Sequence, residues 1–128
     1  MKLLSFASLT ATLMFAGAAY AADLGAEITN AGQHAGLAAS AANLDGVHMH
    51  MHHALNCLVG PKGDGFDAKQ MNPCAQSGNG AIPDEMDAAK KAKLETAKTQ
   101  LMQGIAATDL KTAQTAATTA QTTIASAK

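Results

Sequence analysis

The spacing of residues between Leu24 and Val59 constrains the fold more than any other feature of the chain. Steps of four and three residues alternate without a miss along one seam, which consists of Asn30, His34, Leu37, Ala41, Leu44, His48, Met51, Leu55 and Leu58. This spacing places all these side chains on one face of an α-helix and is typical of a helix that packs in a bundle. The sequence therefore predicts a helix over residues 24–59.

The segment Asn43–Gly46 interrupts this helix chemically, because Asn, Asp and Gly are poor helix formers. The seam keeps its phase across the segment, so we expect one long helix with a kink there. A full break is the alternative, and it adds one helix to the fold.

The remainder of the chain indicates one long loop and two further helices. Residues 60–83 are rich in Gly, Pro, Asn and Asp and show no period, which is typical of a loop. Pro83-Asp84-Glu85 has the composition of a helix start, and so has Thr108-Asp109. We predict helices over 84–103 and 109–127 and no strand. The expected fold is all-α, a small antiparallel bundle of three helices, or of four if the first one breaks.

The two cysteines, Cys57 and Cys74, are expected to form a disulfide. Closing a loop of this length stabilises a fold by roughly 3 kcal/mol in the chain-entropy model. A thiolate of Cys57 acting as a metal ligand is the competing interpretation. The disulfide predicts that the loop is tied back onto the C-terminal end of the first helix.

The first 21 residues have the layout of a secretory signal peptide. Lys2 precedes an uncharged apolar stretch from Leu3 to Ala19, and the small residues of Ala19-Tyr20-Ala21 suit a cleavage site. We predict cleavage after Ala21, export to the periplasm, no membrane insertion after cleavage, and a single helical-bundle domain over 22–128.

Composition argues against two functional classes. Every basic residue is a lysine, and Phe66 is the only aromatic residue after the predicted signal, so we expect no nucleic-acid binding. The chain has no HExxH motif, no phosphate-binding glycine loop and no activated nucleophile. We therefore expect that it is not an enzyme.

The run HMHMHH at residues 48–53 is the strongest chemical signal. It contains four of the five histidines and two of the seven methionines, Met49 and Met51. Imidazole binds zinc, copper and nickel, and thioether sulfur adds a preference for copper. This tract predicts a transition-metal site, with copper ahead of nickel and zinc.

Helical phase divides the tract, because residues two apart lie on nearly opposite sides of a helix. We expect His48 and His52 to face the bundle and form a buried, selective site. We expect His50 and His53 to form a weaker, exposed one. Residues expected to complete these sites are Met51, Met86 and Met102 for the first, and Met71, Asp64 and Asp67 for the second.

His34 is set apart from the tract by distance. On a continuous helix it lies about 21 Å from His48, which is too far to share an ion. Only a hairpin at Asn43–Gly46 brings the two segments together.

Three functions follow from these observations. The first is an exported transition-metal-binding protein that sequesters an ion or passes it to a delivery partner. The second is a bundle that binds haem non-covalently for electron transfer. The third is a non-catalytic envelope protein with a pH-responsive histidine surface, with homodimerisation through the last helix.

Overall fold

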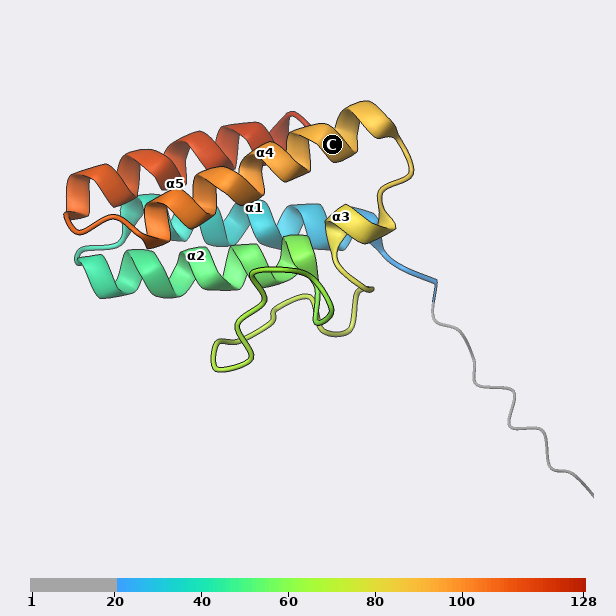
Figure 1. Cartoon of the computed structure of the whole chain (residues 1–128), viewed down its shortest axis with the longest axis horizontal. Helices are drawn as coiled ribbons and strands as arrows, with labels where there is room; N and C mark the ends of the chain where they lie inside the picture. Colours follow the sequence, from blue (N-terminus) through green and yellow to red (C-terminus); the bar gives the residue numbers. More distant parts are fainter. Residues whose placement is uncertain (1–20) are drawn as a thin grey trace, which may run out of the picture.

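The computed structural model describes residues 21–128, and this part of the chain is all-helical, as predicted. It contains four long helices, α1 (Leu24–Ser40), α2 (Leu44–Val59), α4 (Ala88–Ile105) and α5 (Leu110–Ala125), and one short helix, α3 (Ala81–Asp84). The long helices run side by side, and the α1–α2 and α4–α5 turns lie at the same end of the molecule (Figure 1). Nearly all of the predicted signal peptide, residues 1–20, lies outside the described residues.

The expected single helix over residues 24–59 is wrong, because the chain breaks fully and forms the α1–α2 hairpin. Asn43 caps α2, with extended backbone and a side-chain oxygen that accepts a hydrogen bond from the Gly46 N–H at 2.8 Å. An Asn that caps a helix start satisfies an amide that has no partner within the helix. The side chain of Gln114 in α5 also donates to the carbonyl of Ala41 at 2.9 Å, which holds the turn against the bundle.

The last two long helices begin slightly later than predicted. Residues 81–84 form α3, and Asp87 then caps α4 by accepting a hydrogen bond from the Lys90 N–H at 2.9 Å. Asp109 caps α5 in the same way, through the Thr112 N–H at 2.9 Å. The helices predicted over 84–103 and 109–127 are therefore found over 88–105 and 110–125.

The core consists of a few large apolar side chains and many alanines. Its fully buried large members include Met51, Leu55, Leu58, Leu94, Leu101 and Ile124. In α5 the buried residues are Ala113, Ala117, Ala120 and Ile124, which follow one another at steps of three or four. Because alanine side chains are small, the helices can pack closely, and few large side chains are needed to fill the core.

The loop after α2 is fixed to the bundle by covalent and polar contacts. Cys57 and Cys74 form the predicted disulfide, with an S–S distance of 2.04 Å. Gly60 at the start of the loop lies so close to Asn79 near its end that a Cβ on Gly60 would overlap the Asn79 carbonyl. Gly60 has a φ of 68°, which glycine adopts without strain.

Two observations bear on the compartment. A disulfide suggests a location outside the cytoplasm, since thiols are kept reduced within it. Within residues 21–128, no helix combines the length and the apolar character that crossing a membrane requires.

Candidate metal centre

Three imidazoles from two helices meet on the α1–α2 hairpin. His34 is on α1, and His50 and His53 are on α2. One ring nitrogen from each lies within 4.8 Å of the other two, and no other group of three His, Cys, Asp or Glu ligands this close occurs among residues 21–128. The hairpin creates this group, because it turns α1 back along α2 and places His34 opposite the tract.

The three rings are in mutual contact. The Nδ1 atoms of His34 and His50 are 3.4 Å apart. The ring of His53 is nearly perpendicular to the other two, with centroid distances of 5.1 Å to His34 and 5.7 Å to His50. Three rings that face one another at these distances present converging nitrogens, as a metal site requires.

Burial makes these imidazoles good ligands. The side chain of His53 is only 6 % exposed, and its Nδ1 is buried with no hydrogen-bond partner. Burial first, and then the neighbouring His53 and His50, lower the pKa of His34. Burial also lowers the pKa of His53, with smaller effects from His50 and His52. Both rings are therefore neutral at pH 7, the form that binds metals.

An unpartnered buried nitrogen also argues for a ligand on energetic grounds. Burying a polar atom without a hydrogen bond costs about 1 to 3 kcal/mol. A metal ion bound to the group would take one nitrogen from each ring and lie between the facing Nδ1 atoms of His34 and His50. Three imidazoles with a fourth position open is a ligand set known for zinc, and imidazole suits copper and nickel equally.

His48 and His52, which we expected to form the buried and selective pair, lie outside this group. Nε2 of His48 donates to the carbonyl of Ala107 in the α4–α5 turn at 3.1 Å. Nδ1 of His52 lies 3.7 Å from Oδ2 of Asp67 on the loop. The three-imidazole group thus includes the other pair, His50 and His53, and it is not the exposed pair that we expected, because His53 is buried.

The methionines of the tract lie in contrasting environments. Met51 is fully buried, and its thioether packs against Gly104 of α4, so it belongs to the core. Met49 is 42 % exposed. Met86 and Met102 are also exposed, at 90 % and 42 %, and Asp64 pairs with Lys98 at 3.7 Å. Met86, Met102 and Asp64 therefore do not belong to the histidine group.

His34 is the member of the group that the sequence analysis set aside. Its distance from the tract was measured along a continuous helix, and that helix does not exist. The signal for its inclusion was present in Asn43 and Gly46, which mark a helix start as readily as a kink.

Comparison of the chain with protein-family models, with curated proteins and with solved structures gives no match. The arrangement of side chains therefore carries the functional argument. Three histidines held together on one helical hairpin could bind a metal ion.

Proposed function

We propose that this protein is an exported transition-metal-binding protein that holds its ion on His34, His50 and His53 and sequesters it or passes it on. Copper is the first candidate, followed by nickel and zinc. The observation that carries the proposal is the convergence of three ring nitrogens within 4.8 Å, two of them from the HMHMHH tract.

The choice of copper rests on ligand chemistry. Among these divalent ions, copper binds a given set of nitrogen ligands most tightly. The tract also supplies thioether sulfur beside the imidazoles, which zinc and nickel use less readily. Thioether ligands near a nitrogen site therefore favour copper over nickel and zinc.

We infer a binding role rather than catalysis, because the sequence carries no HExxH motif and no phosphate-binding glycine loop. Export fits better than residence in the cytoplasm. The disulfide agrees with an oxidising compartment, and the N-terminal sequence has the layout of a signal peptide. These features together support a periplasmic metal carrier.

The direct test is a titration of metal-free protein with Cu²⁺, Ni²⁺ and Zn²⁺, followed by calorimetry and by competition with a chelator. In the variant H34A/H50A/H53A we expect a loss of affinity of at least about 100-fold, or 2.7 kcal/mol. The matched control is H48A/H52A, which removes two histidines of the same tract that lie outside the group. Circular dichroism establishes that both variants are folded.

Two results would contradict the proposal. The first is equal affinity of the triple variant and the unaltered protein for all three ions. The second is a loss in H48A/H52A as large as that in the triple variant, which would assign binding to the tract in general.

A further inference from the structure

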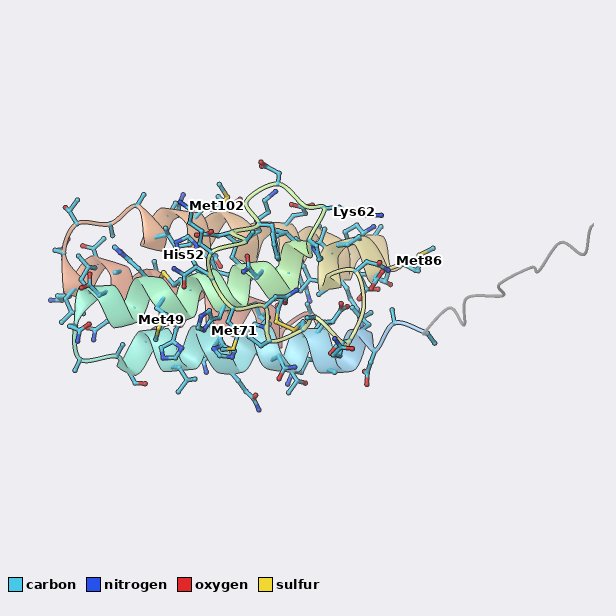
Figure 2. All side chains as sticks on the ribbon, turned by 90° about the horizontal axis from the view of Figure 1, so that it is seen from below. Met49, His52, Lys62, Met71, Met86 and Met102 are labelled. Atoms are coloured by element: carbon cyan, nitrogen blue, oxygen red, sulfur yellow. A yellow bond between two sulfur atoms is a disulfide. The ribbon has the colours of Figure 1, made fainter. Side chains whose placement is uncertain are left out.

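Two exposed methionines flank the histidine group. Met49 lies on α2 one turn before His53, and Met71 lies on the loop that covers this part of α2. Figure 2 shows both side chains on the same face of the α1–α2 hairpin, with Met49 nearer to the turn. Their side chains are 42 % and 57 % exposed, so neither is used to fill the core.

The backbone of Met71 is held in place beside the histidines. Its carbonyl accepts a hydrogen bond at 3.2 Å from the side chain of Asn56, which lies one turn after His53 on α2. The same amide group donates to the carbonyl of Asp67 at 3.0 Å and accepts from the Asp67 N–H at 2.9 Å. The disulfide from Cys57 then anchors the loop three residues further on.

The two methionines therefore lie on either side of His53 along α2. Met49 is at position i−4 relative to His53, and the anchor of Met71 is at position i+3. A methionine side chain is unbranched and has three rotatable bonds, so its sulfur can move toward a metal ion without movement of the backbone. Because Met49 and Met71 are exposed, they do not gain the stabilisation that burial of an apolar side chain provides.

Thioether sulfur is a soft ligand, and soft ligands select reduced copper among the ions that imidazole binds. Zinc and nickel gain little from such a ligand. Two thioethers beside three imidazoles therefore discriminate by oxidation state as well as by element.

We propose that the thioethers of Met49 and Met71 extend the His34, His50 and His53 group into a mixed sulfur and nitrogen site for Cu⁺, with Met71 supplied by the disulfide-anchored loop. This inference rests on the proposed function, since it names the oxidation state of the ion and two further ligands of the same site. It assigns the loop a role in metal selection.

The test compares M49L/M71L with the matched control M86L/M102L, which replaces two exposed methionines away from the histidine group. Leucine retains the size and apolar character of methionine and removes the sulfur. Affinity for Cu⁺ is measured anaerobically by competition with a chromophoric Cu⁺ chelator, with ascorbate keeping the copper reduced. Affinity for Zn²⁺ is measured on the same samples.

We expect M49L/M71L to bind Cu⁺ at least about tenfold more weakly than the control, a change of about 1.4 kcal/mol, with affinity for Zn²⁺ unchanged. X-ray absorption of the Cu⁺ form is expected to show a sulfur neighbour that M49L/M71L lacks. Equal Cu⁺ affinities of the two double variants would overturn the inference, and so would an equal loss of Zn²⁺ binding. In both cases H34A/H50A/H53A still decides separately whether the histidine group binds metal.

Discussion

Nδ1 of His34 on α1 lies 3.4 Å from Nδ1 of His50 on α2, sixteen residues away in the chain. Two imidazole nitrogens this close repel each other unless one carries a proton or a cation lies between them. The metal-free protein must therefore fix one tautomer, whereas a bound metal ion lets both rings present a lone pair. This relationship links metal binding to the stability of the hairpin.

We expect metal to stabilise the folded protein against heat. A ligand present at 100 times its Kd adds about 2.7 kcal/mol when it binds only the folded state. Differential scanning calorimetry with and without Cu²⁺ or Zn²⁺ measures this as a rise in Tm. The rise is expected to persist in H48A/H52A and to be absent in H34A/H50A/H53A, and a rise of equal size in all three proteins would contradict it.

Glu27 is expected to make stability depend on pH in the opposite sense from an ordinary carboxylate. Burial, aided by the neighbouring Asp84 and Asp23, raises the pKa of Glu27 to about 7, while a hydrogen bond from the Gly80 N–H at 2.8 Å opposes the shift. The folded state therefore holds a proton that the unfolded state releases near 4.5. Its stabilising effect is complete below pH 4.5 and is lost as the pH rises through 7.

Urea unfolding of metal-free protein at several pH values between 4.5 and 8 tests this expectation. The variant E27Q retains a neutral side chain of the same shape and is expected to remove roughly 2 to 3 kcal/mol of pH dependence. D45N, at an exposed position in the first turn of α2, serves as the control. An unchanged pH profile in E27Q would show that Glu27 does not hold the proton.

His34 and His53 are expected to act in the reverse direction. Their pKa values are lowered by burial in the folded state, so the unfolded state takes up protons first as the pH falls below 6.5. The contribution is present above pH 6.5 and is lost as the pH falls through the lowered values.

Measuring unfolding in the E27Q background isolates the histidine contribution from that of Glu27. Stability is expected to decrease from pH 7 to pH 5, and H34Q is expected to reduce the decrease, because it removes one of the two rings whose pKa is lowered by folding. H48Q, outside the group, is expected to leave it unchanged. A pH profile that H34Q and H48Q alter equally would refute this assignment.

Asn56 is expected to be the most sensitive polar residue of the loop anchor. It is fully buried, and its side chain joins α2 to residues 67–71 through both its oxygen and its nitrogen. N56A removes these bonds and leaves the Asp67 N–H without its partner, which we expect to cost roughly 2 to 4 kcal/mol.

The matched control is N79A, which removes an exposed amide that donates to Asp84 at 3.0 Å. Its expected cost is below about 1 kcal/mol. Hydrogen exchange of residues 67–71 is expected to accelerate in N56A alone. Equal stability of the two variants in urea would show that Asn56 does not anchor the loop.

Gly104 is expected to set the spacing of α2 and α4. A Cβ at this position would collide with the thioether of Met51 and would lie 3.0 Å from the Cβ of Ala116. We expect G104A to destabilise the protein by about 1 to 3 kcal/mol, as overpacking does.

G32A is the contrasting substitution in the interior of α1. There a Cβ would meet Ile124 at 3.6 Å, an ordinary contact, so the higher helix propensity of alanine is expected to stabilise the protein by up to about 1 kcal/mol. Thermal unfolding separates the two. Stabilisation in both variants would mean that Met51 moves aside at little cost.

The seam, the caps and the cysteines determined much of this protein from the sequence alone. Alternating steps of four and three residues fixed the helical class, and Asp109 marked the start of α5, because these signals depend on neighbours along the chain. The pairing of Cys57 with Cys74 followed from there being only two cysteines. The chemical nature of the candidate site also followed from composition, since the tract holds most of the histidines.

Only the tertiary structure decided which histidines meet. The residues Asn43–Gly46 suit either a kink or a helix start, and packing of α1 against α2 and α5 decides between them. The break brings in His34, leaves His48 bonded to Ala107, and groups His34 with His50 and His53. Local patterns specify which face of a helix a residue occupies, whereas the partner of that face depends on contacts between segments distant in the chain.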